Sequence, residues 1–473
     1  MIILILLTAP TVRAESLLEL WGHVVESNPT LMSSEHAVEQ ARAQQDQALA
    51  KLLPNASVKG FYSFNSLNDS VNKNGFNLLG NSKEYTGYNG NITISQAIFD
   101  LPSYLRLQGA HHLTRQQEQK ALALRMQIAY NLVDNYLLIL EAEDIIDELA
   151  AERTATAAQI ERLRHMHENQ LVKVTDLYEV EAYGQALETS SLEADHQRAI
   201  AAEKVREIAG VPIEHPDKLH QETFPELRRG ADEWVEEALR ANPALLTLQY
   251  ASESAQQMIA SANAQHLPTA SVSASETIAN TIYNNLQTQG LDSYNIGTLY
   301  LNVNIPIYSG GAVEAGVRES VQQYQITREK IEETRRAIEK ETRTAWYNVV
   351  SGHSRIDSSR KEVGFREKVK DGQQKGYELG AATIIDVLDA QRRLLKARAE
   401  YQKAKYDFVR SLIRLRLNSG SLADLDLEAI GEWFAPSRTV KPDSSSGEYG
   451  IESANGASQS INLSLRTRFG GER

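Results

Sequence analysis

Histidines and carboxylates are the side chains of this sequence that could bind a metal or transfer protons. Two histidine-rich spots occur, His111-His112 and His165-Met166-His167, but neither has a third ligand at a metal-binding spacing. The chain contains no cysteine, which excludes disulfides, thiolate metal sites and a cysteine nucleophile. It also has neither a phosphate-binding loop nor a nucleophile elbow. We therefore expect no catalytic residue, no metal and no cofactor.

The charge of the chain also narrows the class of protein. The formal net charge is -13, and no long run of Lys and Arg is present. A surface that follows nucleic-acid phosphates needs clustered basic residues. We therefore expect no nucleic-acid partner.

The first fourteen residues, MIILILLTAPTVRA, form a short apolar run that ends in the small-x-small pattern Val12-Arg13-Ala14. This pattern is typical of a secretory signal peptide cleaved after Ala14. The alternative is an ordinary buried strand at the N-terminus.

Most of the remaining chain is a tandem repeat. Two prolines in each half mark equivalent positions 214 residues apart: Asn28-Pro29 and Leu53-Pro54, then Asn242-Pro243 and Leu267-Pro268. Later landmarks repeat at an offset of 210, since Asp176 corresponds to Asp386 and Gly210 corresponds to Gly420. This duplication predicts that the two halves contain the same elements in the same order.

Each half begins with a predicted helix, over residues 31 to 52 and 244 to 266, and then a predicted β-hairpin. In the last strand Leu299, Leu301, Val303 and Ile305 alternate with Tyr300, Asn302 and Asn304. The polar faces of the strands are rich in Ser, Thr and Asn. Such a face would meet bulk water in a soluble sandwich, or line the lumen of a pore. The hairpin loops, about 66 to 84 and 284 to 293, have the composition of exposed loops.

After each hairpin the pattern becomes helical. Long helices are predicted over 102 to 168, 174 to 209, 311 to 379 and 384 to 418. In the last of them a heptad of large residues is joined by alanines three positions further on: Val387, Leu394, Tyr401, Phe408 and Leu415, with Ala390, Ala397 and Ala404. A heptad repeat predicts a supercoiled helical pair. The acid pairs along these helices predict salt bridges from i to i+4. The helices alone also fit a free-standing coiled-coil scaffold.

Four amphipathic strands, each with one polar and one apolar face, are too few to close a pore, because the smallest membrane barrels use about eight. Closure would therefore require several copies of the chain. The strands alone allow any number of copies from two upward.

The turn before the last long helix carries the most specific motif. Residues 377 to 391, YELGAATIIDVLDAQ, resemble the helix-turn-helix signature of TolC-like outer-membrane efflux and secretion channels, the outer membrane factors. Residues 305 to 311, IPIYSGG, resemble the strand-to-helix junction in the second repeat of that family. The resemblance spans residues 16 to 430 and recurs in order in both halves.

This resemblance implies a mainly α-helical protein with a membrane β region. The protomer would be a tandem repeat within a trimeric twelve-stranded β-barrel, continued by a long α-helical coiled-coil barrel in the periplasm. Its role would be a passive, non-enzymatic exit duct in the outer membrane. It would conduct proteins, by type I secretion, or small molecules. The implied partners are two further copies of the chain, a periplasmic adaptor (membrane fusion) protein, an inner-membrane ABC or proton-driven transporter, and outer-membrane lipid.

The expected organisation divides the chain into eight segments. They are the signal peptide (1–14), first equatorial and tunnel helices (15–54), first barrel hairpin (55–99), first long helical hairpin (100–210), equatorial segment and second-repeat helix (211–267), second barrel hairpin (268–308), second long helical hairpin (309–420), and an equatorial C-terminal segment with a flexible tail (421–473).

The resemblance also implies a periplasmic aperture. Asp386 and Asp389 would form its ring of carboxylates, with Gly380 and Thr383 in the turn beside them. Three copies would place about six carboxylates around one opening, a field that favours cations. The alternative is that these aspartates stabilise the N-terminus of their own helix.

Tethers that hold the aperture closed are implied at Tyr377, Thr175 and Asp176. The arginine that family members carry after the glycine is absent, because Ala382 stands there. Lys173, in the equivalent turn of the first half, is the proposed substitute.

A periplasmic adaptor or structural coiled-coil protein that forms no pore is the alternative function. The duplicated two-faced hairpins argue against it. Cargo is not encoded in a motif, and the absence of a lipid-anchor cysteine slightly favours protein over drug export. The tail from about 436 is expected to be loosely packed, with residues 461 to 465 as a candidate short strand.

Overall fold

A computed structural model describes residues 16–66, 84–220, 224, 227–283, 293–422 and 424–435. The expected signal peptide, the hairpin loops and the C-terminal tail lie outside these residues.

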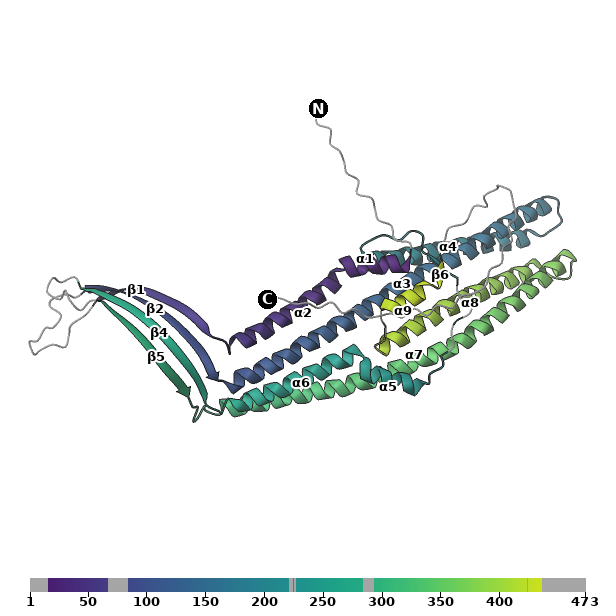
Figure 1. The fold of residues 1–473 in the computed structure, drawn as a ribbon. Helices are drawn as coiled ribbons and strands as arrows, with labels where there is room; N and C mark the ends of the chain where they lie inside the picture. The colour runs from purple at the N-terminus through teal and green to yellow at the C-terminus, as the bar shows by residue number, and fades with distance from the viewer. Residues whose placement is uncertain are drawn as a thin grey trace, which may run out of the picture. The chain divides into compact units, whose positions relative to one another are not determined.

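The first six elements of the two halves follow the same order, and the second half has one further helix, α9, before its short strand (Figure 1). The first half contains α1 (Leu17–Ser27), α2 (Pro29–Ala50), β1 (Asn55–Ser66), β2 (Glu84–Phe99), α3 (Leu101–Glu168), α4 (Val174–Ala209) and β3 (Lys218–Leu219). The second contains α5 (Ala231–Ala241), α6 (Pro243–Ala264), β4 (Thr269–Tyr283), β5 (Ser293–Asn304), α7 (Ala312–Glu378), α8 (Ile384–Asn418), α9 (Asp424–Gly431) and β6 (Phe434–Ala435).

The asparagine before each repeat proline explains where α2 and α6 begin. Asn28 accepts a hydrogen bond from the amide of Leu31 at 3.0 Å, and Asn242 accepts one from Ala244 at 2.9 Å. Proline suits the first helical position, since its missing N–H would have no partner there. Both helices therefore start at the proline, and the sequence prediction placed their starts one or two residues too late.

The same two asparagines also hold the ends of the long returning helices. The Nδ2 of Asn28 donates to the carbonyl of Ile208 at 2.7 Å, and the Nδ2 of Asn242 donates to that of Asn418 at 2.8 Å. These carbonyls lie at the C-termini of α4 and α8, where helices leave acceptors unsatisfied. In each repeat, one asparagine thus caps the N-terminus of one helix and donates a hydrogen bond to the C-terminus of another.

The four long strands form one antiparallel sheet in the order β1-β2-β4-β5. The two hairpins were predicted, and the ladder between β2 and β4 joins them. This ladder makes the two repeats share a single sheet.

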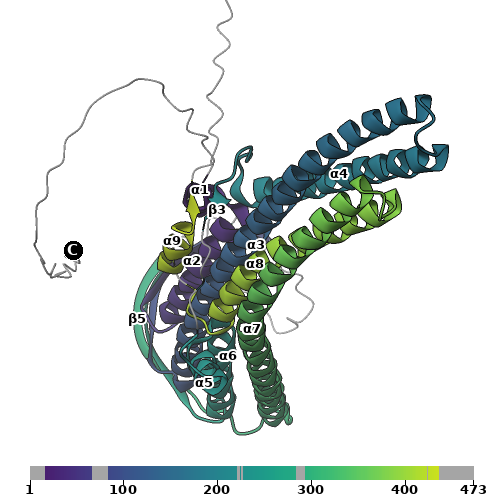
Figure 2. The same ribbon diagram turned by 90° about the vertical axis from the view of Figure 1, so that its right-hand side faces the viewer.

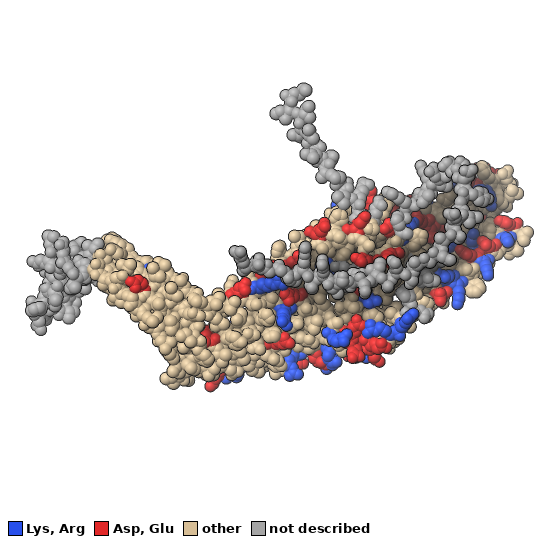
Figure 3. All heavy atoms as spheres, in the orientation of Figure 1, with Lys and Arg blue, Asp and Glu red and all other residues tan. Residues whose placement is uncertain are grey.

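The register of the sheet gathers most of its Ser, Thr and Asn residues on one face, whereas Glu276 of β4 lies on the other. One row across the four strands consists of Ser57, Thr93, Ser275 and Thr298. On this face Asn91 donates to Thr277 at 2.7 Å, which links the two repeats. The opposite face carries Val58, Ile92, Ile94, Leu299 and Leu301, all at least half exposed in the single chain. Figure 3 shows how few charged side chains the strands carry compared with the helices.

The long helices lie where the sequence predicted them, and α3 and α7 have 68 and 67 residues. A rod of 68 residues is roughly 100 Å long. In α8 the predicted heptad faces inward, since Val387, Phe408 and Leu415 are fully buried. None of the described helices has a run long and apolar enough to cross a membrane.

The largest apolar core lies where α1, α3, α4, α8 and α9 meet. Tyr136 of α3 packs edge-on against Phe434, and Phe408 of α8 packs against Phe224. A second, separate core joins the α3–α4 turn to the start of α8. The two helical hairpins of the chain run side by side toward these turns (Figure 2).

Candidate functional site

The turns that join α3 to α4 and α7 to α8 share one backbone conformation. A closing hydrogen bond spans five residues in each, from Leu171 N to Met166 O at 2.8 Å and from Ala381 N to Gly376 O at 2.7 Å. Gln170 and Gly380 hold the left-handed position, with φ of 59° and 74°. Glycine accepts this conformation without steric cost, and glutamine does not.

Thr383 and Asp386 form a capping box at the start of α8. The amide and hydroxyl of Thr383 donate to Asp386 Oδ2 at 2.8 and 2.6 Å, and the Asp386 amide donates to Thr383 Oγ1 at 3.2 Å. The hydrogen bonds from the Thr383 hydroxyl and amide lower the pKa of Asp386, which is exposed. The carboxylate therefore stays charged and caps its own helix.

Asp389 lies one turn further along α8 and is half exposed. Its Oδ2 pairs with Arg393 at 2.6 Å within the same helix. Asp386 and Asp389 thus share a helix face, but Asp386 already bonds the N-cap Thr383 and Asp389 already pairs within α8. Both remain candidates for an aperture ring.

The first-half turn has different side chains at the equivalent positions. Lys173 holds the N-cap position of α4 but makes no side-chain capping bond. The side chains of Lys173 and Thr175 are exposed, and Asp176 is partly buried. Within the part of the chain that the structure describes, Lys173 forms no ion pair. Its role as a tether therefore stays a prediction.

Tyr377, at the end of α7, is brought near Asp176 of α4. Burial raises the pKa of Tyr377, and the negative charge of Asp176 raises it further. The ring packs against the second apolar core, in which Ile384, Val387 and Leu388 are buried. Tyr377 of the second repeat therefore lies within range of the charge of Asp176 in the first, and the role of both as tethers stays a prediction.

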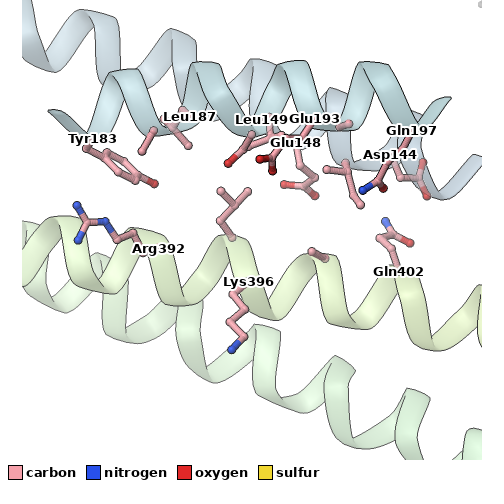
Figure 4. A pocket seen from close by; sticks show the side chains of 16 residues that line it. Asp144, Glu148, Leu149, Tyr183, Leu187, Glu193, Gln197, Arg392, Lys396 and Gln402 are labelled. Atoms are coloured by element: carbon pink, nitrogen blue, oxygen red, sulfur yellow. The ribbon is translucent and has the colours of Figure 1, made fainter. Parts of the chain in front are cut away.

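A cavity of about 420 Å³ opens between α3, α4 and α8, behind the turns (Figure 4). Its apolar wall includes Leu149, Leu187 and Leu395. Arg392 of α8 stacks on the ring of Tyr183 of α4, with 5.2 Å between the guanidinium carbon and the ring centroid. The two repeats are thus loosely packed between the turns and the main core.

The charged contacts between α3 and α8 were missed in the sequence. The ion pairs predicted from i to i+4 do form elsewhere in the helices, for example between Glu332 and Arg336 and between Glu362 and Arg366. Glu141, Asp144 and Glu148 of α3 behave differently. They accept hydrogen bonds from α8 instead: from Arg410 at 2.7 Å, Tyr406 at 2.7 Å and Arg398 at 3.0 Å. Their spacing of three and four residues places them on one helix face, which was the available signal.

The histidine-rich spots are occupied by ion pairs. His112 pairs with Glu253 of α6 at 2.8 Å, and His165 pairs with Glu161 and Glu168 of its own helix. Among the described residues no group of three ligands could hold a metal.

The comparisons with known proteins agree with this fold. The model of the family described as outer membrane efflux protein matches residues 234–421. Outer membrane protein TolC of Escherichia coli is 26% identical over 445 residues, which cover 91% of this chain and 87% of TolC. The proteases secretion protein PrtF of Dickeya chrysanthemi is 24% identical, covering 90% and 93%. The chain is a homologue of the TolC-like outer-membrane efflux and secretion proteins.

The solved outer-membrane channel CmeC of Campylobacter jejuni has the same fold as this TolC homologue. The TM-score is 0.74 at 14% identity, with 89% of this chain and 90% of CmeC covered. The predicted fold class is confirmed: a mainly helical protomer of the TolC type.

Proposed function

We propose that this TolC homologue is one protomer of a trimeric, non-enzymatic exit duct in the outer membrane. The observation that carries the proposal is its sheet, in which most Ser, Thr and Asn residues share one face while β1 and β5 form the two edges. An edge strand presents backbone donors and acceptors that need a partner. Pairing β5 of one copy with β1 of the next satisfies both edges, and three copies give a barrel of twelve strands with a polar lumen.

The helices repeat the order of the strands. Going across the chain, α2 packs on α3, α3 on α6, and α6 on α7. This leaves α2 and α7 at the edges, as β1 and β5 are in the sheet. The same association of copies therefore extends the duct as a helical barrel into the periplasm.

Channels of the TolC type are trimers that work with adaptor proteins and inner-membrane transporters. For this chain we propose protein cargo, delivered by an ABC transporter and a periplasmic adaptor. The support is the relative whose name refers to protease secretion. Small molecules are the alternative cargo.

Purification of the full chain from membranes tests the duct. We expect a detergent-dependent trimer that forms ion-conducting channels in planar bilayers. A monomer that stays soluble without detergent and conducts no current would overturn the duct and support the adaptor alternative.

A deletion in the native host distinguishes the cargo. Loss of proteins from the culture medium, with unchanged sensitivity to dyes and detergents, supports protein export. The reverse pattern supports small-molecule efflux.

A further inference from the structure

Glu276 of β4 is a charged side chain on the apolar face of the sheet. It lies opposite Ile92 of β2 and Gly297 of β5. Ile92 in turn lies opposite Val58, so this row belongs to the face that meets lipid in the proposed barrel. Among the described side chains of the four strands, no other one on this face is charged. An ionisable residue that faces lipid is costly, and its position therefore suggests a binding role.

The carboxylate of Glu276 has no partner in the single chain. It is exposed, and within the described residues it forms neither an ion pair nor a hydrogen bond. Lys59 of β1 lies on the opposite face, in one row with Asn91 and Thr277. Closing the barrel adds strands beside β1 and β5, whereas β4 already has a strand on each side. The partner of Glu276 is therefore expected from the surrounding membrane.

Glycines beside Glu276 leave a notch in this face. Gly297 is its neighbour on β5, and Gly90 lies diagonally on β2, opposite Gly60. A Cβ added at Gly297 would lie 2.9 Å from Glu276 Oε2, and one added at Gly90 would have no atom within 4 Å. The carboxylate thus lies over the position where Gly297 lacks a side chain. Asn295, two residues from Gly297 on the same face, adds an amide oxygen. Glycine within a strand often marks a close approach of another group to the backbone.

The side chains on the two sides of the notch differ. Toward the helices the face is aliphatic, and its exposed residues are Ile94, Leu299, Leu301 and Val303. Toward the hairpin loops it is aromatic, and its exposed residues are Tyr62, Phe64 and Tyr88. Tyr88 precedes Ile92, in the row of Glu276, by four residues, or roughly 13 Å of strand. Aromatic girdles lie at the membrane interface. The notch therefore lies just inside one end of the apolar band, near the level at which lipid head groups join their acyl chains.

We propose that this notch binds the primary ammonium of a phospholipid head group. An ammonium carries the charge opposite to that of Glu276 and has three N–H donors. The acceptors available to it are the carboxylate, the amide oxygen of Asn295, and the second lone pairs of backbone carbonyls beside the glycines. The acyl chains lie along the aliphatic side, and the rest of the head group points toward the aromatic side. This inference rests on the proposed function, because it requires the strands to cross a membrane.

Native mass spectrometry of purified full-length trimers tests the proposal. Delipidated trimers are titrated with phospholipids that have identical acyl chains and different head groups. Phosphatidylethanolamine is expected to be retained about two- to fivefold more than phosphatidylglycerol, the range for an exposed ion pair. Phosphatidylcholine has a cation without an N–H donor, so its retention should be close to that of phosphatidylglycerol. Glu276→Gln is expected to remove the preference for phosphatidylethanolamine.

The matched control is Glu314→Gln. It removes the same charge from an exposed glutamate in the first turn of α7, outside the sheet. This variant should keep the preference of the wild type.

A second variant tests the shape of the notch without changing its charge. Gly90→Val fills the notch but leaves the carboxylate of Glu276 in place. No atom lies within 4 Å of the added Cβ, and valine suits a strand, so trimers should still form. Retention of phosphatidylethanolamine should fall to the level of phosphatidylglycerol.

The outcomes separate this inference from the proposed function. Trimers that conduct current but retain phosphatidylethanolamine and phosphatidylglycerol equally would overturn the lipid site alone. A Glu276→Gln variant that keeps the preference would do the same. Equal retention of phosphatidylethanolamine and phosphatidylcholine would overturn the assignment of a primary ammonium. A wild-type chain that stays monomeric without detergent and conducts no current would instead refute the duct.

Discussion

The two turns of the repeat have the same backbone but different chemistry. In the second half Gly380 fits the left-handed position, and Thr383 and Asp386 cap α8 with three hydrogen bonds. In the first half Gln170 occupies the left-handed position, and Lys173 provides no capping bond.

This difference changes what the equivalent aspartates can do. Asp386 is held by its own helix, whereas Asp176 lies near Tyr377 of the other repeat. The two turns thus share one backbone geometry. The α7–α8 turn caps its own helix, whereas the aspartate of the α3–α4 turn lies near the other repeat. The first-half turn is therefore the weaker and more adaptable of the two.

The largest expected effect comes from the left-handed glycine. Gly380→Val should weaken the α7–α8 turn by about 2 kcal/mol, because a β-branched residue is strained at φ of 74°. Gln170→Gly should act in the opposite direction on the α3–α4 turn, by less than about 1 kcal/mol. Amide hydrogen exchange of peptides from both turns measures the two effects. Equal protection of the turns in the wild type would contradict the comparison.

The carboxylates of α8 should dominate ion selectivity. Asp386→Ala combined with Asp389→Ala is expected to reduce the preference for cations by roughly tenfold at low salt, because a focused negative field is lost. Reversal potentials in a salt gradient provide the measurement, with Asp371→Ala as a control for charge lost elsewhere. Unaltered selectivity would show that these aspartates only cap and pair within their helix.

The capping residues give the next effect. Thr383→Val should destabilise the start of α8 by about 1 kcal/mol, and Lys173→Thr should stabilise the start of α4 by a similar amount. The two changes remove the cap from α8 and add one to α4. Amide hydrogen exchange at the start of each helix measures both effects. If Lys173→Thr leaves α4 unchanged, the missing cap is not what distinguishes the turns.

The contribution of Asp386 to this cap depends on pH in a defined direction. Its pKa in the folded protein is lowered by the bonds from Thr383, so the stabilisation is present above the unfolded pKa of about 4. It is lost as the pH falls through the folded pKa. The difference between wild type and Thr383→Val should therefore be constant from pH 5 to 8 and shrink below about pH 4.

Much of the fold could be predicted because local signals set it. Asparagine caps and prolines fix where α2 and α6 begin, and glycines mark where α4, α7 and α8 end. These signals act within a few residues. The alternation of β5 likewise identifies its faces. Contacts between the repeats could not be predicted in this way. The ladder of β2 with β4 depends on how the halves meet in space, and no local pattern encodes it.

The candidate site was predictable to the same extent. The motif around Gly380 and Asp386 locates the turn, since its residue types follow from the backbone they must adopt. The partners of Glu148 did not follow from the sequence. No Lys or Arg lies three or four residues away from it in α3, and no local pattern indicates which other helix supplies the cation. Only the antiparallel packing of α3 on α8 selects Arg398.

The smallest expected effect tests whether the first-half turn acts as a tether. Tyr377→Phe removes the hydroxyl that lies within range of the charge of Asp176 while keeping the partly buried ring. Because no hydrogen bond between them is formed in the isolated chain, the change in the open-to-closed ratio should be about twofold or less, equivalent to some 0.4 kcal/mol. Tyr178→Phe, on an exposed tyrosine of α4, is the matched control.

Lys173→Ala should give a similar small rise in current if this lysine replaces the absent arginine at Ala382. If neither change differs from Tyr178→Phe, the apolar packing of Ile384 and Leu388 alone keeps the repeats together at the turns, and tethering must be sought between copies of the chain.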